Sequence, residues 1–433
     1  MISRGERKFV LNVGDTYNVE IDDINIFANG VCRVGNIVVF VKNALKGENC
    51  LIRITEVYPN YAYAVVEEYI KISPERENPS CPHFQNCGGC SFLHTTIDEE
   101  NRIKVDYVKR SFEKQGINAS FEKIVCPISN RYRNKVVLFY NGESFGYMKS
   151  ESGEIVPHSL CLLNDDIFDE IAKKTGEILK DTSLRALYMR KSYDSKEIMI
   201  CPILYKKLDI DSYVQEVTGK FPQIKTIYCA NSSDEKLVLE KLHFNLVYGE
   251  GYIKDQICGL EFRISPESFY QVNHTCAEQL YEKAIELANL NENSKCADLF
   301  CGTGTIGIIA SKKTGAKVYG VEIVTRAVED AKYNADINGA SNANFEAKDA
   351  GKFDKKIDTA IIDPPRKGCN KIMLNTLLRL NPKRIVYVSC NVDTMVRDLK
   401  TLLDEYKLSS PVFTYNLFPH TSHVESVVCL TRK

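Results

Sequence analysis

The feature that most constrains the fold is a regular alternation of strand and helix patterns that begins near residue 265. Apolar residues at helical spacing between Cys276 and Ala288 lead into the first strand pattern. The strand patterns lie at 295–300, 316–321, 344–347, 357–363, 384–389, 412–417 and 424–430. This alternation predicts a doubly wound parallel α/β sheet. The loop at 418–423 is too short for a crossover helix, so the last two strands must pair antiparallel.

A chain of 433 residues exceeds the size at which one hydrophobic core usually stops growing, so we expect more than one domain. Residues 8–70 show short β-branched runs separated by turn residues such as Asn29-Gly30, which predicts a small closed β-barrel. Barrels of the OB type offer one strand face to single-stranded nucleic acid, and an inert accessory barrel is the alternative. Proline-containing turns near residue 74 mark a boundary. The predicted domains are the barrel at 1–70, a central α+β domain with a cysteine knuckle and a linker helix at 71–264, and the doubly wound sheet at 265–433.

Charge and composition limit the partners and the compartment. Lys and Arg number 56 and Asp and Glu number 57, so the net charge of -1 does not indicate a polyanion partner. RNA contacts must come from local patches, and the basic stretches at 102–114 and 131–135 are by default solvated faces. Since no apolar stretch could span a membrane and the start lacks a secretory signal, we expect a cytoplasmic protein. Its 16 cysteines are then thiols, metal ligands or nucleophiles.

A glycine-containing loop follows the first strand of the predicted sheet. It runs from Asp298 to Thr305 with the sequence DLFCGTGT, and its glycines let a ligand approach the backbone. Two further acids follow the next two strands, where Glu322 is placed for ribose hydroxyls and Asp349 for an adenine edge. Together they outline a nucleoside-binding site.

Two cofactors carry such a nucleoside. Gly302, Gly304 and Gly307 match the G-x-G-x-x-G pattern of NAD sites, and Glu322 lies at a suitable distance beyond them. Asp298, however, would repel a pyrophosphate, whereas it can face the ammonium group of S-adenosylmethionine. The loop therefore favours S-adenosylmethionine, with NAD as the alternative.

A thiol is predicted beside this cofactor. The motif DPPR at 363–366 closes the fourth strand and SCN at 389–391 closes the fifth, so both lie at the carboxyl edge, where open α/β sheets bind ligands. A thiolate that adds to carbon 6 of uracil turns the ring into an enolate whose carbon 5 attacks a methyl group. A base must then remove the proton at carbon 5. Glu425, at the start of the last strand, is the candidate, and His423 is its competitor. Cysteines at strand ends are more often small buried hydrophobes, so the case for Cys390 rests on the neighbouring motifs.

Three further thiols, Cys81, Cys87 and Cys90, lie close together in the sequence, with two glycines that let the backbone fold around an ion or cluster. Zinc normally takes two short C-x2-C pairs, whereas three clustered cysteines plus a distant one occur at iron-sulfur sites. The spacing favours an iron-sulfur cluster over zinc, with Cys161 as the fourth ligand. The alternative fourth ligands are His83, His94 and Cys126.

As a set, these motifs resemble the RNA uracil-5 methyltransferase family, most closely the members that act on 23S ribosomal RNA and bear an N-terminal TRAM domain. The resemblance spans almost the whole chain and includes SPESFYQVN at 265–273. It implies a Rossmann-like class I methyltransferase sheet, nucleophilic Cys390 and basic Glu425. The implied 4Fe-4S ligands are Cys81, Cys87, Cys90 and Cys161. The implied contacts to S-adenosylmethionine are Gln271, Phe300, Glu322, Asp349 and Asp363. Thr305 replaces an asparagine of some members, so no contact is carried over to it.

The resemblance also implies a substrate. Relatives specific for tRNA generally lack the barrel and the cysteine cluster, so 23S ribosomal RNA is expected and tRNA is the alternative. The barrel and central domain would hold the RNA, with the basic stretches on phosphates and the target base unstacked. An RNA cytosine-5 methyltransferase is a rival, against which Glu425 and the cluster argue. A non-catalytic RNA-binding protein is another, against which the intact Cys390 and cofactor loop argue. We expect a monomer with no obligate protein partner and no membrane association.

Overall fold

The computed structural model describes residues 10–149, 152–157, 160–180, 182–234 and 236–433. The first residues of the chain, on which the absence of a secretory signal was argued, lie outside this range. The chain divides into two compact units. Unit 1 consists of Met1–Gln85, Gly89–Val108 and His420–His423, and unit 2 consists of the remainder. Within the described ranges, no helix is long and apolar enough to cross a membrane.

Unit 1 contains a six-stranded sheet in the order β1-β5-β6-β4-β3-β2. Its strands are β1 (Thr16–Glu20), β2 (Asp23–Ile24), β3 (Asn29–Val34), β4 (Ile37–Lys42), β5 (Asn49–Val57) and β6 (Tyr61–Lys71). The strands at its two ends, β1 and β2, are separated by only two residues, so one stretch of chain pairs with β5 and then with β3. The Asp22 amide continues this pairing by donating to the Val31 carbonyl at 2.9 Å. The sheet therefore closes on itself, which confirms the predicted barrel.

The prediction of a turn at Asn29-Gly30 was wrong, because these residues begin β3. A Cβ on Gly30 would lie 2.8 Å from the Ile21 side chain and 2.9 Å from Ala44. Glycine is therefore required here by close packing inside the barrel and not by turn geometry.

Helix α1 (Ile97–Lys114) contains the basic stretch at 102–114, but one of its cations does not face solvent. Lys104 is fully buried and pairs with buried Glu100 at 2.7 Å. A buried ammonium that already has a carboxylate partner is not available to a phosphate. Lys104 is thus part of the interior of the protein, which corrects its assignment to a solvated, RNA-facing surface.

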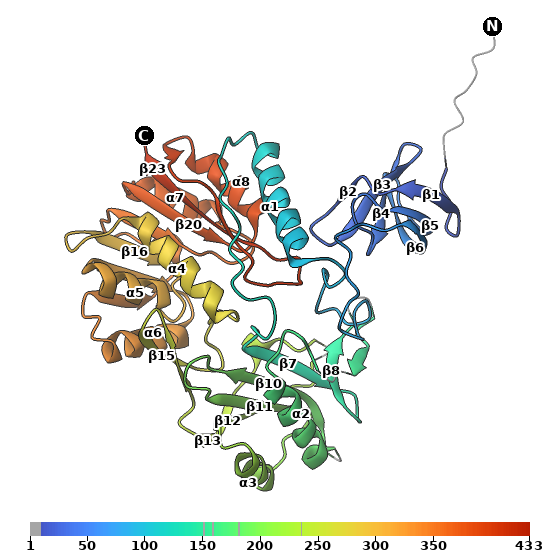
Figure 1. The fold of residues 1–433 in the computed structure, drawn as a ribbon. Helices are drawn as coiled ribbons and strands as arrows, with labels where there is room; N and C mark the ends of the chain where they lie inside the picture. Colours follow the sequence, from blue (N-terminus) through green and yellow to red (C-terminus); the bar gives the residue numbers. More distant parts are fainter. Residues whose placement is uncertain (1–9, 150–151, 158–159, 181, 235) are drawn as a thin grey trace. The chain divides into compact units, whose positions relative to one another are not determined.

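Unit 2 contains a seven-stranded mixed sheet in the order β13-β12-β11-β10-β7-β8-β9 (Figure 1). Its strands are β7 (Lys135–Tyr140), β8 (Phe145–Met148), β9 (Ile155–Pro157), β10 (Leu184–Lys191), β11 (Ile198–Leu204), β12 (Ile224–Asn231) and β13 (Asn245–Gly249). Helices α2 (Asp166–Leu179) and α3 (Asp211–Lys220) pack on one face through residues such as Phe168 and Tyr213. Alternate strand residues such as Tyr188 and Cys201 join the core of the C-terminal sheet instead.

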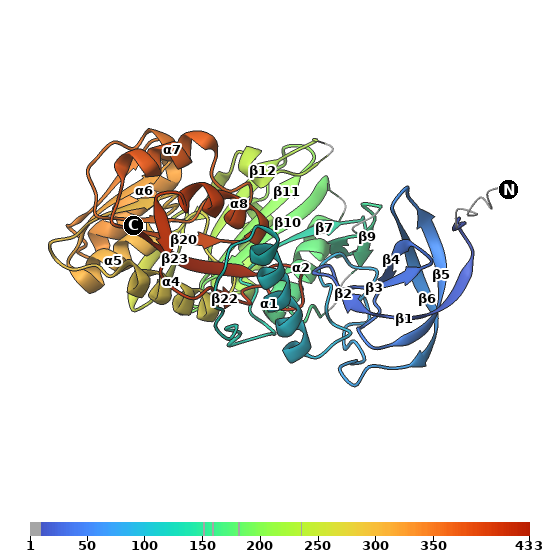
Figure 2. The ribbon, with the colours of Figure 1, turned by 90° about the horizontal axis from the view of Figure 1, so that it is seen from above.

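The C-terminal sheet of unit 2 runs in the order β18-β17-β16-β19-β20-β23-β21, and β22 also pairs with β23. Its strands are β16 (Lys295–Leu299), β17 (Lys317–Glu322), β18 (Ala343–Ala347), β19 (Thr359–Ile362), β20 (Arg384–Ser389), β21 (Tyr406–Leu408), β22 (Phe413–Tyr415) and β23 (Glu425–Arg432). The hairpin of β14 (Ile253–Ile257) and β15 (Leu260–Ile264) precedes it. Its helices are α4 (His274–Ala288), α5 (Thr305–Thr314), α6 (Thr325–Ile337), α7 (Lys371–Leu380) and α8 (Val392–Leu402). Figure 2 shows α4 and α5 on one side of the sheet and α7 and α8 on the other. This confirms the predicted doubly wound sheet.

The predicted antiparallel end of this sheet is confirmed, with one correction. Strand β22 pairs antiparallel with β23, and Tyr415 lies opposite Glu425. A further strand, β21, was not predicted and pairs with the other end of β23. The segment between β21 and β22 contains Pro411, which has no N–H for the ladder, and the Ser410 hydroxyl accepts the Cys429 amide at 2.9 Å instead. One edge strand is therefore interrupted and becomes two.

Candidate active site

The loop between β16 and α5 is bent by three left-handed residues. Phe300, Gly302 and Gly304 have φ angles of +70°, +53° and +80°. A Cβ on Gly304 would lie 2.8 Å from the Phe345 ring, so glycine is needed there for packing as well. Phe300 adopts a backbone conformation that is uncommon for a bulky residue, and such conformations occur most often at functional sites. The loop therefore has the geometry expected of a ligand cradle.

Asp298 separates the two cofactor readings of this loop. Its Oδ2 accepts the amide of Gly307, in the first turn of α5, at 2.8 Å, and the side chain is 1% exposed. A dinucleotide would place its pyrophosphate at this helix N-terminus, where the carboxylate already satisfies the helix. Burial, together with the charges of Asp363 and Glu322, raises the pKa of Asp298 to about 7. The structure thus favours a cofactor without a pyrophosphate.

Glu322 ends β17 with its carboxylate held by three backbone amides. Oε1 accepts from Ile323 at 2.8 Å and Val324 at 2.9 Å, and Oε2 accepts from Gly302 at 3.3 Å. These bonds tie the end of β17 to the glycine loop. An acid fixed at this place can accept hydrogen bonds from ribose hydroxyls, as the sequence predicts.

The remaining predicted donor contacts lie on three other segments. Asp363 directly follows β19, and burial raises its pKa to about 7. Asp349 follows β18 and is exposed, with its Oδ1 accepting the Gly351 amide at 2.9 Å. Gln271 is buried in the loop before α4, where its carbonyl accepts the Asn134 amide group at 3.0 Å. Asp363 and Glu322 both contribute to the raised pKa of Asp298, whereas Gln271 approaches from outside the sheet.

Cys390 and Glu425 are neighbours across two strands. Ser389 at the end of β20 lies opposite Ser426 of β23, Cys390 and Glu425 directly adjoin this last pair, and the charge of Glu425 acts on the Cys390 thiol. Burial raises the pKa of the Cys390 thiol to about 11, with further contributions from Glu425 and Asp363, while Arg366 opposes the shift. Burial and the charge of Asp363 raise the pKa of Glu425 to about 8. The thiol, two carboxyl groups and one guanidinium therefore share one site.

The DPPR and SCN motifs are tied together by Asn391. Its Nδ2 donates to the Arg366 carbonyl at 3.0 Å, and its Oδ1 accepts the Asp393 amide at 3.2 Å to cap α8. Cys390 therefore lies just before a helix N-terminus, where the dipole favours a thiolate. His423, the competing base, lies in the loop before β23 and is half-buried.

The sequence analysis missed the residues that hold the loop at 265–273. Arg190 of β10 is 1% exposed and donates to the carbonyls of Ser268 at 2.8 Å and Tyr270 at 2.9 Å. Fully buried Asp330 of α6 accepts the Ser268 hydroxyl at 2.5 Å. Between these anchors, Phe269 is 60% exposed. The available signal was an arginine within the strand pattern LRALYMRK at 184–191, because a charge is rarely buried without partners.

Replacing Arg190 by methionine is expected to lower the free energy of unfolding by about 2–4 kcal/mol, because two buried carbonyls lose their donor. The affinity for S-adenosylhomocysteine should fall as well, because the loop also carries Gln271. Thermal unfolding and calorimetric titration measure the two effects. Arg185→Met is the matched control, since Arg185 lies on the same strand but binds Ser232 at 2.9 Å. Equal loss of ligand affinity in both variants would contradict this account.

The four predicted cluster ligands differ in their burial. Cys81, Cys87 and Cys90 are half-buried and Cys161 is buried. In the part of the chain that the structure describes, no group of three or more His, Cys, Asp or Glu side chains is arranged to hold a metal ion. Of the alternative ligands, His94 is buried, and this burial lowers its pKa to about 4. Residues 158–159 of the segment before Cys161 lie outside the described range.

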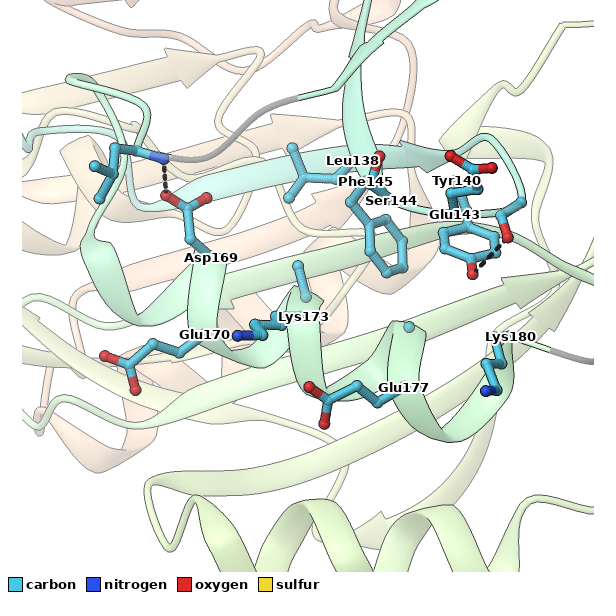
Figure 3. A pocket seen from close by; sticks show the side chains of 14 residues that line it. Leu138, Tyr140, Glu143, Ser144, Phe145, Asp169, Glu170, Lys173, Glu177 and Lys180 are labelled. Atoms are coloured by element: carbon cyan, nitrogen blue, oxygen red, sulfur yellow. Dashed lines mark hydrogen bonds between the residues drawn. The ribbon is translucent and has the colours of Figure 1, made fainter.

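A cavity of about 700 Å³ lies between α2 and the strands β7 and β8, away from the carboxyl edge of the C-terminal sheet (Figure 3). Leu138, Tyr140 and Phe145 form its apolar part, and α2 adds the charged residues Lys173 and Glu177. None of the residues that line it belongs to the C-terminal sheet. It is therefore separate from the candidate active site.

Comparison with known proteins agrees with the two-part architecture. The family model of the TRAM domain matches residues 10–66, and that of a methyltransferase domain matches residues 290–420. Among solved structures, the chain is similar to the Pyrococcus abyssi tRNA (uracil-54, C5)-methyltransferase in complex with S-adenosyl-L-homocysteine. The identity is 26% and the TM-score 0.79, covering 96% of this chain and 99% of that one.

Full-length sequence relatives are named as uncharacterized RNA methyltransferases. One, from Caldanaerobacter subterraneus, is 33% identical over 450 residues, covering 98% of this chain and 99% of the relative. Another, from Oceanobacillus iheyensis, is 33% identical over 457 residues, covering 98% of each chain. The methyltransferase-domain match and the S-adenosyl-L-homocysteine complex of the structural neighbour support S-adenosylmethionine as the cofactor. The chain belongs to the family of S-adenosylmethionine-dependent RNA methyltransferases that carry an N-terminal TRAM domain.

Proposed function

We propose that this protein methylates carbon 5 of a uridine in RNA through a covalent adduct between Cys390 and carbon 6 of the base. The proximity of Cys390 and Glu425 at the carboxyl edge of the sheet carries the proposal. It supplies a nucleophile and a base on the same side of one site, as addition, methylation and elimination require. The likeness to a tRNA uracil-5 enzyme over 96% of the chain supports it independently.

In the proposed reaction, each residue at the carboxyl edge of the C-terminal sheet has a separate role. S-adenosylmethionine, held by Gln271, Phe300, Glu322, Asp349 and Asp363, supplies the methyl group. The Cys390 thiolate adds to carbon 6, and the positive charge of Arg366 favours its ionised form. Carbon 5 of the resulting enolate would then take the methyl group, with S-adenosylhomocysteine as the leaving group. The Glu425 carboxylate then takes the proton from carbon 5, and the electrons left behind expel the thiolate and restore the ring. Phe269, exposed beside Gln271, supports the unstacked base by ring contact.

The substrate class follows from two observations of unequal weight. The expectation that tRNA enzymes lack the barrel was wrong as a criterion, because the tRNA enzyme of Pyrococcus abyssi matches 96% of this chain. The cysteine segment remains as the argument for 23S ribosomal RNA, which we propose as the substrate. Transfer RNA is the second candidate, favoured by that structural likeness.

Nucleoside mass spectrometry of RNA from cells with and without this gene tests the function. Loss of 5-methyluridine from the large ribosomal RNA is the expected result, and loss from tRNA would transfer the same chemistry to the second candidate. Loss of 5-methylcytidine instead would refute uracil specificity. Unchanged nucleosides would refute the proposal. RNA binding without catalysis would then be the remaining function.

The rate is expected to depend steeply on pH because of Glu425. Burial raises its pKa to about 8, and only the ionised form can accept the proton from carbon 5. Below that pKa, the ionised fraction falls tenfold for each pH unit. The Cys390 thiolate must also form, and because the pKa of this thiol is raised to about 11, its ionised fraction rises over the same range. We therefore expect kcat/KM to rise about a hundredfold per unit below about pH 8 and about tenfold per unit above it. Initial rates between pH 5.5 and 9 measure this, and a constant slope with no break near pH 8 would exclude Glu425 as the base.

We also propose a 4Fe-4S cluster on Cys81, Cys87, Cys90 and Cys161. The proposal rests on their spacing and on the family resemblance, since metal ligands commonly converge only when the metal binds. Protein purified without oxygen should contain about four irons per chain. Cys161→Ser should lose them, whereas the control Cys126→Ser should retain them. Stoichiometric zinc, or iron retained by Cys161→Ser, would contradict this ligand set.

A further inference from the structure

A second cavity in unit 2, of about 110 Å³, is lined by an excess of cations. Arg131, Arg133, Lys191 and Lys196 line it, against one carboxylate, that of Asp165. Ligand pockets for whole small molecules have volumes of roughly 300 Å³ or more. This cavity is therefore suited to a small anionic group or a fragment of a larger ligand.

The cations are fixed in place by their surroundings. Arg131 donates to the carbonyls of Cys161 at 2.7 Å and Asn164 at 2.9 Å and pairs with the Asp166 carboxylate at 2.6 Å, and the Lys191 ammonium pairs with Asp165. Unlike the fully buried pair of Lys104 with Glu100, both of these pairs are partly exposed and screened by solvent. Arg131 and Lys196 have φ angles of +54° and +60°, a region that residues other than glycine rarely adopt. Two of the four cations at this cavity are therefore held in backbone conformations that are unfavourable for residues other than glycine.

Two buried polar atoms of the lining have no hydrogen-bond partner, Asn134 Oδ1 and His274 Nδ1. Asn134 uses its amide NH₂ group on the Gln271 carbonyl, so its oxygen is free to accept. His274 is 6% exposed, and its Nε2 lies 2.5 Å from the Gln256 carbonyl, so Nε2 must carry the proton there. Nδ1 lies 3.9 Å from the Glu278 carboxylate and, in the neutral ring, is also an acceptor. Both atoms can accept a hydrogen bond from a hydroxyl group, and the cations can donate to acceptor oxygens.

A ribose phosphate satisfies both requirements. Its phosphate oxygens accept from Arg and Lys, and its 2′-hydroxyl can donate to Asn134 or His274. His274 is also the first residue of α4, where the helix dipole favours an anion. Tyr193 stacks on the His274 ring with centroids 4.2 Å apart and is half-exposed, so it forms one wall at the surface.

The cavity adjoins the candidate active site through Asn134. The Asn134 side chain donates to Gln271, and its backbone amide donates to Val272 at 3.1 Å. Gln271 is a proposed methyl-donor contact. We propose that this cavity binds one ribose phosphate of the RNA chain next to the target uridine. The inference rests on the proposed function, because it assumes that the RNA strand passes Gln271.

The first test measures how salt affects the affinity for RNA. Lys196→Gln removes one exposed cation of the cavity, and Lys220→Gln removes one exposed cation of α3 as a matched control. A transcribed RNA hairpin with a uridine loop serves as the probe. The slope of log K against log salt should become shallower by about 0.7 in Lys196→Gln, the contribution of one phosphate on a single strand. A slope equal to that of Lys220→Gln would overturn the inference.

The second test locates the phosphate. Methylphosphonates placed one at a time around the target uridine remove single phosphate charges. At one position the neutral linkage should weaken RNA binding by the wild type but not by Lys196→Gln. The losses of binding free energy from the two changes are then not additive, as expected for groups in contact. Additive losses at every position would refute the site. Equal affinities of both variants for S-adenosylhomocysteine verify that both are folded. RNA binding is measured without turnover, whereas uracil methylation is tested by nucleoside analysis. Failure of one proposal can therefore be distinguished from failure of the other.

Discussion

Cys390→Ala is expected to abolish methylation, with a loss in kcat on the order of 10⁴-fold to 10⁶-fold, as when a nucleophile is removed from other covalent enzymes. Carbon 5 of uracil does not attack a methyl group until a thiolate has added to carbon 6. Affinities for RNA and for S-adenosylhomocysteine should change little, because alanine removes only the sulfur. Transfer of radiolabelled methyl groups to RNA measures the effect.

Cys258→Ala is the matched control for this experiment. Cys258 lies on the turn between β14 and β15, is half-buried, and has its pKa raised by burial to about 11, like Cys390. It should retain nearly full activity. Substantial methylation by Cys390→Ala would exclude the covalent mechanism and favour a direct transfer.

Glu425→Gln is expected to stop the reaction one step later and to leave enzyme and RNA joined. Addition and methyl transfer do not need the carboxylate, whereas removal of the proton from carbon 5 does. Turnover should fall on the order of 10²-fold to 10⁴-fold, while a methylated adduct between Cys390 and carbon 6 accumulates. Denaturing gel electrophoresis with labelled RNA detects it as a band of lower mobility.

The double variant Cys390→Ala with Glu425→Gln controls for non-specific crosslinks and should give no such band. Comparison with His423→Gln separates the two candidate bases. An adduct that accumulates in His423→Gln but not in Glu425→Gln would transfer the role of base to the histidine.

Much of the active-site placement was predictable because it follows from strand direction. Asp298 is the last but one residue of β16, and Asp363 and Cys390 directly follow β19 and β20. The hydrophobic pattern identifies all three strands, and parallel strands bring their carboxyl ends to one edge. The residues around that edge were not predictable. Arg190 and Asp330 contact the loop at 265–273 from elements far away in the sequence, and no local pattern records such contacts.

The sequence by itself determined the closed barrel, the α/β alternation and the order of the chemical motifs, because periodicity and turn residues act over a few neighbouring positions. Tertiary structure decided which cations are available. Lys104 lies in a basic stretch yet is buried against Glu100, whereas Lys191 and Lys196 come together with Arg131 around a cavity. It also decided the chemistry of Glu425, whose pKa depends on burial beside Asp363. Burial and charge pairing depend on segments that meet only after folding, and this is the physical reason for the division.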